Sequence, residues 1–155
     1  MQFLEGSWVQ ITIFVLGFFG FAVARHIYKH KDDNKHPLVC PIKFDCHTVV
    51  HSDYSKFFGV PVEIFGMIYY AFISFAYLVL VFFPMPSIMS VDLAIVAIAM
   101  SSIAFIFSLY LILVQIFILK KGCSWCIVSA FICFFIFILT MMNYDFNEII
   151  RVLTV

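Results

Sequence analysis

The sequence predicts an all-α membrane protein, a bundle of four transmembrane helices with a long loop between the first and second spans. Of its 155 residues, 65% are hydrophobic and only 12% are charged, whereas about a quarter of the residues in a soluble domain are charged. Four apolar runs supply the roughly 20 residues that a helix needs to cross a bilayer core about 30 Å thick. The connections between the runs are very unequal, and the first, counted from about His26 at the end of the first run to Glu63, holds all five histidines. We therefore expect membrane lipid to surround most of the chain.

The first apolar run, residues 8–28, is interpreted as a membrane span. It lies near the N-terminus, but it has no basic start and no small-residue cleavage site, and it is longer than the apolar segment of a signal peptide. The other spans are expected over residues 64–83, 93–119 and 123–142, and none of the four carries a charge at its centre. Together they form a single predicted domain over residues 1–155.

Two of the connections are short and one is long. Residues 84–92 join the second and third spans. Residues 120–122 form a tight turn before the fourth span, with Gly122 expected at the helix C-cap. Residues 29–63 form a polar loop that contains most of the acidic residues. This inequality predicts that the chemistry lies in the long loop and near residues 120–122, the connection on the same side of the membrane as the loop.

The five cysteines fall into two pairs and one single residue. Cys40 and Cys46 lie in the long loop, Cys123 and Cys126 begin the fourth span, and Cys133 lies about two turns further along the same helix. In a four-span protein the first and third connections lie on the same side of the membrane. Both pairs must therefore share one face. We expect Cys133 to be a small buried residue without a chemical role.

The second pair has the pattern of a redox-active site. Cys123 and Cys126 form a Cys-x-x-Cys motif at a helix N-terminus, where the helix dipole and the unpaired N–H groups favour a thiolate. Lys120 and Lys121 add positive charge beside it. A thiol with a lowered pKa is more often a thiolate and is a better leaving group in exchange. Alone, the motif also occurs in zinc sites and by chance.

The loop pair leaves more than one interpretation open. Cys40 and Cys46 enclose five residues, a segment short enough to be closed by a disulfide and flexible enough to move toward the fourth span. Two dithiols on one face suggest a relay, and the alternative is a static disulfide that pins the loop. A different alternative is a metal-binding or assembly factor that uses these cysteines with His47 and His51, at i, i+4 spacing, as ligands. The zinc content of purified protein separates these classes.

The cysteine segments resemble the vitamin K epoxide reductase family, in its bacterial and archaeal form without a fused thioredoxin-like domain. The resemblance covers about residues 8–143 and is carried by CPIKFDCHTVVHSDYSKFFGVPVEIFGMIYY in the loop and GCSWCIVSA at the fourth span. Its other specific features are Ser52, six residues after the second loop cysteine, the Phe-Gly-Val-Pro turn at residues 58–61, and Gly66 in the second span.

The resemblance implies a membrane thiol:quinone oxidoreductase that supports disulfide bond formation. In that scheme a separate thioredoxin-like protein delivers electrons to the loop pair through Cys40, and Cys46 then attacks Cys123. Cys126 faces the quinone, of the ubiquinone or menaquinone class, and becomes the thiolate that reduces it. Ser52 is implied to lie near the quinone pocket, although an ordinary Ser could equally cap the short helix that follows.

The sequence departs from the vertebrate enzymes of this family at two positions. Those enzymes place an Asn early in the second span and a Tyr four residues after the last active cysteine, where this chain has Val62 and Ala130. Quinone reduction is therefore the better expectation than epoxide reduction. Phe65, Tyr69 and Tyr70 are interpreted as core or lipid-facing residues. The alternative of a DsbB-type protein is disfavoured because that family has its Cys-x-x-Cys in the first connection.

The charges oppose the expected orientation. The formal net charge is zero, which gives no basis for nucleic-acid binding. Only Arg151 is a basic residue of the face opposite the cysteines, and the cysteine face has eight: Arg25, Lys29, Lys31, Lys35, Lys43, Lys56, Lys120 and Lys121. The positive-inside rule places such a face in the cytosol, whereas disulfide formation belongs to an oxidising exterior. On the habit of the family we expect an extracytoplasmic active site.

Overall fold

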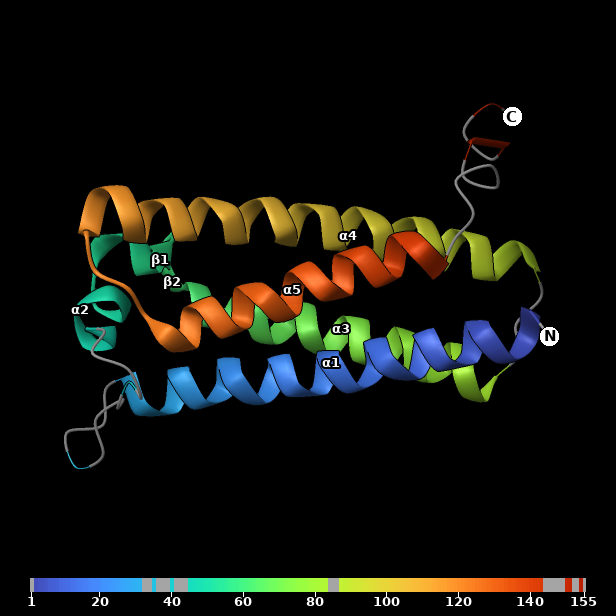
Figure 1. The fold of residues 1–155 in the computed structure, drawn as a ribbon, viewed down its shortest axis with the longest axis horizontal. Coiled ribbons are helices and arrows are strands. Elements are labelled where there is room, and N and C mark those ends of the chain that lie inside the picture. The colour runs from blue at the N-terminus through green and yellow to red at the C-terminus, as the bar shows by residue number, and fades with distance from the viewer. Residues whose placement is uncertain are drawn as a thin grey trace.

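Four long helices dominate the computed structural model of this chain. The structure describes residues 2–31, 35, 40, 45–83, 87–143, 150, 151 and 154, with only the backbone at residues 2–6, 87, 88 and 90. The helices, which lie lengthwise beside one another, are α1 (Gln2–Lys31), α3 (Val62–Phe82), α4 (Ser87–Leu113) and α5 (Ser124–Asn143) (Figure 1). Each is long and apolar enough to cross a membrane. The predicted fold class, an all-α bundle of four spans, is therefore confirmed.

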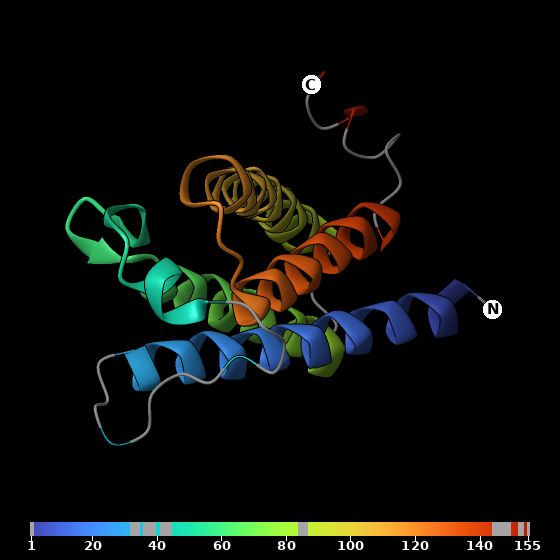
Figure 2. The ribbon, with the colours of Figure 1, turned by 60° about the vertical axis from the view of Figure 1, so that its left-hand side comes forward.

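The described part of the long loop folds into short elements at one end of the bundle. They are α2 (Cys46–Val50), the 3-10 helix η1 (Asp53–Ser55) and the strands β1 (Lys56–Phe57) and β2 (Val60–Pro61). The strands form an antiparallel hairpin whose turn residues, Phe58 and Gly59, have φ of 52° and 79°. Positive φ at both positions is the conformation of a tight hairpin turn, which Gly adopts easily. Helix α2 lies beside the start of α5 and the end of α1 (Figures 1 and 2), and Phe57 of β1 contacts Phe107 of α4.

Hydroxyl groups of helix α3 bond to each of the three other spans. Tyr69 Oη donates to Ser101 Oγ of α4 at 3.2 Å, and Tyr70 Oη donates to the Ser129 carbonyl of α5 at 2.8 Å. Ser74 Oγ donates to a carbonyl of α1 at 3.4 Å. Lipid tails are as apolar as the side chains, so such polar contacts and small residues decide how membrane helices pair.

The third span ends differently from the sequence prediction. Helix α4 continues into a π-helix, η2 (Val114–Leu119), and the residue that stops it is Lys120, with a left-handed φ of 50°. The expectation that Gly122 caps this helix is wrong. The reason is that the Lys121 N–H donates to the Gln115 carbonyl at 3.2 Å, which turns the chain two residues before the glycine. π-Helical turns are often found at functional sites.

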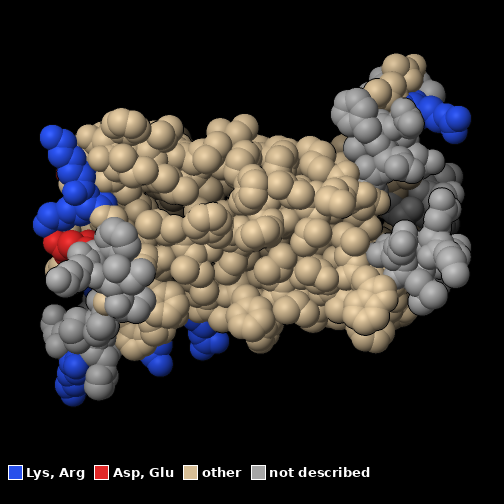
Figure 3. Space-filling model, viewed as in Figure 1, with Lys and Arg blue, Asp and Glu red and all other residues tan. Residues whose placement is uncertain are grey.

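The charged residues lie at the two ends of the molecule. Figure 3 shows Lys, Arg, Asp and Glu gathered mainly at the end that carries α2, while the described surface of this face between the ends carries few of them. Large exposed side chains along this band include Phe75, Ile103 and Phe131. An apolar band between charged ends is the surface that a bilayer covers. The chain is thus an integral, multi-pass membrane protein.

Candidate active site

Three of the four candidate cysteine sulfurs meet at the end of the bundle that carries α2. Cys40 and Cys46 form a disulfide with a Cα–Cα distance of 6.0 Å. The Sγ atoms of Cys40, Cys46 and Cys123 all lie within 4.8 Å of one another. Cys123 and Cys126 are free thiols. A loop dithiol and a helix dithiol that are far apart in the sequence are therefore adjacent in space, as thiol exchange requires.

An ion pair holds the loop cysteines beside the second pair. Asp45, the residue before Cys46, caps α2 by accepting from the Thr48 N–H at 3.2 Å and from the Thr48 hydroxyl at 2.8 Å. The same carboxylate pairs with Lys121 Nζ at 2.6 Å, two residues before Cys123. The hydrogen bond from Lys121, followed by those from Thr48, lowers the pKa of the Asp45 carboxyl to about 2. Lys121 is therefore engaged by a carboxylate.

The sulfurs lie in a small apolar cluster. Cys46 and Cys123 are 2% and 0% exposed, and the cluster around them joins α1, α2 and α5 through Ile27, Val49 and Val50. The ring of His26, also from α1, lies 4.7 Å from the ring of Trp125, within the Cys-x-x-Cys motif. Exchange between these sulfurs is consequently shielded from bulk water.

Backbone and side-chain contacts fix the position of Cys123 and lower its thiol pKa. Its N–H donates to the buried Gln115 Oε1 at 3.3 Å, which ties the start of α5 to the π-helix. Its Sγ accepts from the Cys126 N–H at 3.4 Å. The pKa of the Cys123 thiol is lowered, first by a hydrogen bond from the Cys126 side chain and further by the N–H groups of Cys126 and Trp125, against the effect of burial. A lowered pKa makes Cys123 a good leaving group in exchange.

An apolar cavity of about 350 Å³ adjoins the cysteines. Its wall comes from the loop elements and from all four spans, and Cys126 is the member of the Cys-x-x-Cys pair that contributes to it. The volume and the predominantly apolar wall with a few polar groups fit a small-molecule site. Val62 and Ala130, two positions at which the sequence departs from the vertebrate enzymes, also line it.

Ser52 lines this cavity but does not cap the next helix. It occupies the N-cap position of η1 without a side-chain capping bond. Its hydroxyl instead donates to the Val49 carbonyl at 2.7 Å and so closes the turn after α2. Of the two roles expected for Ser52, the position beside the cavity is the one that its surroundings support.

The sequence interpretation missed several residues of the cavity wall. Phe65, Tyr69 and Tyr70 line it, and the two tyrosines are also buried in the core. Gln115 and Glu63 line it as well. The sequence holds a signal for Glu63, because an acid in the first turn of an otherwise apolar span often has a function. The predicted bounds place Glu63 at the end of the loop, residues 29–63, and so hide this signal. Cys133 is buried, as expected, and contributes to the same wall.

Among the residues that the structure describes, Cys40, Cys46, His47 and His51 do not come together as the metal-binding alternative requires. The one group of three metal-binding side chains found there consists of Cys40, Cys46 and Cys123, and the disulfide removes two of its thiolates. The rings of His47 and His51 stack on each other at 4.2 Å, and His51 Nδ1 lies 2.9 Å from the His47 carbonyl. Neither histidine joins a cysteine cluster.

The sequence matches one known family. The model of the vitamin K epoxide reductase family matches residues 11–141, a segment that contains all four candidate cysteines and most of each span. No curated protein matches the chain closely enough to count as a relative. The family consists of membrane oxidoreductases that act on quinone-type substrates with thiol partners. Both the fold and the matched segment thus lead to one assignment: the chain belongs to the vitamin K epoxide reductase family.

Proposed function

We propose that this chain is a membrane thiol:quinone oxidoreductase that moves electrons through its two cysteine pairs. The donor is a separate reduced thioredoxin-like protein, and the acceptor is a quinone of the ubiquinone or menaquinone class held in the cavity. The observation that carries the proposal is the sulfur arrangement. Cys123 lies within 4.8 Å of the loop sulfurs, while Cys126 lines the cavity.

Each exchange step conserves electrons within this arrangement. The donor reduces the Cys40–Cys46 disulfide and becomes a disulfide itself. The Cys46 thiolate then attacks Cys123 of an oxidised Cys123–Cys126 pair, and Cys126 leaves as a thiolate. Cys40 attacks Cys46 and releases Cys123, whose lowered pKa favours its departure. A loop disulfide beside free Cys123 and Cys126 is the arrangement expected at the end of this exchange.

The last step returns the second pair to its oxidised state. The two thiols give two electrons and two protons to the quinone, which becomes quinol, and Cys123 and Cys126 form a disulfide. Electrons flow from the donor dithiol to the quinone, and the oxidised donor can then form disulfide bonds in its own substrates. The apolar Val62 and Ala130 at the cavity wall favour a quinone over an epoxide as the natural substrate.

Quinol formation by the purified protein tests this proposal. With a reduced thioredoxin-like donor and ubiquinone-1, Cys126→Ala should lose turnover, because the thiol at the cavity wall is gone. The matched control is Cys133→Ala, the same chemical change in the same helix and the same cavity wall, which measures the effect of lost side-chain volume alone and should keep substantial turnover. If Cys126→Ala turned over quinone at the parent's rate, Cys126 would not be the quinone-side thiol.

A further inference from the structure

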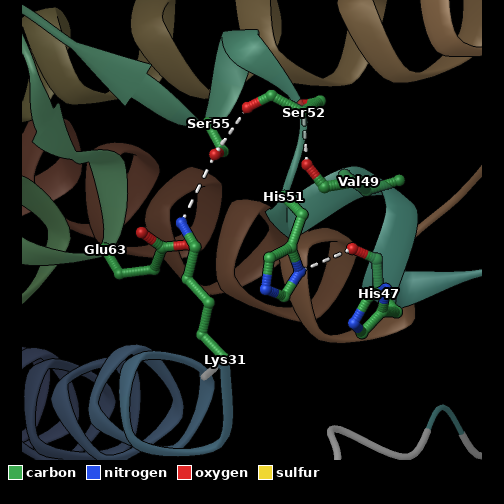
Figure 4. A network of polar contacts seen from close by, with 7 residues as sticks. All are labelled: Lys31, His47, Val49, His51, Ser52, Ser55 and Glu63. Carbon is green, nitrogen blue, oxygen red and sulfur yellow. Dashed lines mark hydrogen bonds and ion pairs between the residues drawn. The ribbon is translucent and has the colours of Figure 1, made fainter.

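A buried ion pair lies beside the cavity, at the end of the bundle that carries α2. Glu63 belongs to the first turn of α3 and Lys31 to the last turn of α1. Lys31 Nζ lies 3.5 Å from Glu63 Oε1, and the two side chains are only 6% and 10% exposed. Figure 4 shows Lys31 extending from α1 toward Glu63 and Ser55. Ionisable groups so placed in a membrane protein are costly to bury and usually functional.

In the described part of the chain, Lys31 has two polar partners, whereas only one of the two oxygens of the Glu63 carboxylate has a partner. Lys31 Nζ also donates to Ser55 Oγ at 3.3 Å, and Ser55 Oγ donates to the Ser52 carbonyl at 2.7 Å. Among the residues that the structure describes, Glu63 Oε2 is buried and has no hydrogen-bond partner. A buried carboxylate oxygen without a partner is costly. A polar atom of a molecule in the cavity is the natural partner for it, because Glu63 lines that cavity.

The same carboxylate also belongs to the cavity beside the second cysteine pair. Glu63 and Cys126 line one cavity. The negative charge of Glu63 raises the pKa of the Cys123 thiol, against the larger effects that lower it. The carboxylate and the thiols therefore interact across a low-dielectric site. Carboxylates that are positioned in this way serve as general acids and bases in many enzymes.

We infer that Glu63 carries a proton from the cysteine pair to the quinone, an inference that rests on the proposed function. The proton of the Cys126 thiol passes to Glu63 Oε2 through the cavity that both residues line, and Lys31 offsets the charge that the carboxylate carries before and after. As the Cys123–Cys126 disulfide closes and two electrons leave the sulfurs, Glu63 donates that proton to a quinone oxygen. The second proton, from Cys123, passes to water, and the other quinone oxygen takes one from water. Glu63 ends as a carboxylate.

A purely structural role for Glu63 makes a different prediction. The ion pair joins α1, α3 and the loop, so a structural role would impair the sulfur exchange and the quinone step together. A proton-carrying role impairs only the quinone step. Other titratable groups line the same cavity, namely Tyr54 of η1, Tyr69 and Tyr70 of α3, and Cys126 and Cys133 of α5, and Lys31 pairs with Glu63, so a pH profile alone would not separate them.

The experiment measures the two half-reactions separately in the full chain. In the first, dithiothreitol reduces the oxidised protein, and thiol alkylation with mass spectrometry follows the Cys123–Cys126 pair. In the second, pre-reduced and desalted protein is mixed with ubiquinone-1, and quinol formation is followed by stopped-flow absorbance. The variants are Glu63→Gln, which keeps an acceptor for Lys31 but cannot carry a proton, and Glu63→Ala. Asp53→Asn, at an exposed acid of η1, is the matched control.

We expect Glu63→Gln to reduce its disulfide at the parent's rate but to form quinol about 100-fold more slowly. Formate, a small carboxylic acid, should restore quinol formation in Glu63→Ala, whose cavity has room for it, but not in Glu63→Gln. Asp53→Asn should match the parent in both steps. Unchanged quinol formation in Glu63→Gln would overturn the inference, as would an equal loss of both half-reactions. If the parent itself formed no quinol, the proposed function would fail first.

Discussion

Cys123 and Cys126 are three residues apart, yet their surroundings differ. Cys123 is fully buried beside the loop sulfurs, and its thiol pKa is lowered by hydrogen bonds from the Cys126 side chain and from N–H groups at the start of α5. Cys126 is partly exposed and lines the cavity. This difference supports the proposed roles, in which Cys123 exchanges with the loop and Cys126 reduces the quinone.

Removing the second thiol should therefore trap the relay. In Cys126→Ser, the Cys46–Cys123 disulfide should accumulate, because no resolving thiol is left on the helix side. Mass spectrometry of digested, alkylated protein identifies the linked peptides, and Cys133→Ser serves as a control that should show no such species. Finding only Cys40 joined to Cys46 would instead favour a static disulfide that pins the loop.

The ion pair of Asp45 with Lys121 gives a prediction about pH. The pKa of Asp45 lies at about 2, below its usual 3.8, so the pair stabilises the docked α2 above pH 3.8, and this stabilisation is lost as the pH falls through about 2. Lys121→Met removes the largest cause and should raise this pKa toward 3.8, measured from the carboxyl-carbon NMR shift. Lys120→Met, one residue away, should leave it unchanged. Identical titrations in parent and Lys121→Met would contradict the assignment.

At the scale of helices, close contact between α1 and α3 depends on glycine. A Cβ on Gly20 would lie 2.5 Å from ring carbons of Tyr70, and one on Gly17 would lie 3.3 Å from the Ser74 Cβ. The Tyr70 ring cannot move away easily, because it is 2% exposed and its hydroxyl bonds to Ser129. Small residues in this way let two membrane helices approach.

Gly20→Ala should consequently destabilise the bundle by about 1–3 kcal/mol, since the added methyl forces α1 away from α3. Thermal unfolding in detergent measures the loss. The matched control is Gly66→Ala, because a Cβ there meets its nearest neighbour, Ala24 Cβ, at an ordinary 3.7 Å. Equal unfolding temperatures for the two variants would argue against the close contact.

At the scale of the whole molecule, the loop pair is the part that a large donor can reach. Cys40 is partly exposed at the end of the bundle, whereas Cys123 is fully buried. Sulfur exchange requires direct approach, so access and not only redox potential decides the rate. The charged end carries α2, which begins with Cys46, and it is the end at which a water-soluble protein would meet the molecule (Figure 3).

The two donors should accordingly differ in what they need. When both Cys40 and Cys46 are replaced by Ala, turnover with a thioredoxin-like donor should disappear, while dithiothreitol, being small, should still reduce Cys123–Cys126 and sustain quinol formation. Quinol absorbance measures both, and the single change Cys133→Ala is the control. Loss of both activities in a folded double variant would mean that the loop cysteines shape the cavity, and retention of both would make them dispensable.

The side of the membrane that the active site faces is a separate prediction. On family habit we expect Cys40 to react with a membrane-impermeant maleimide in intact cells after an impermeant reductant opens the disulfide. Arg151→Cys in a background without other cysteines should react only after lysis, because Arg151 belongs to the opposite face. The reverse result would match the positive-inside rule and place the site in the cytosol.

The sequence alone was sufficient to predict the four spans, the shared face of the cysteine pairs and the family. These features depend on local composition and on cysteine order, because the length of an apolar run decides whether a helix crosses the bilayer, and the number of spans decides which connections meet. The π-helix before Cys123 was not predicted, since the Lys121 N–H bonds to a carbonyl that no local pattern singles out.

Only the tertiary structure decided what surrounds the reactive sulfurs. The ion pair of Lys31 with Glu63 and the bond from Gln115 to Cys123 each join residues that the sequence interpretation had assigned to loops or to the apolar core. The cavity likewise takes its wall from every span. The physical reason is that bilayer insertion depends on the hydrophobicity of each segment separately, whereas a cavity depends on how small residues and hydroxyl groups pair the helices after insertion.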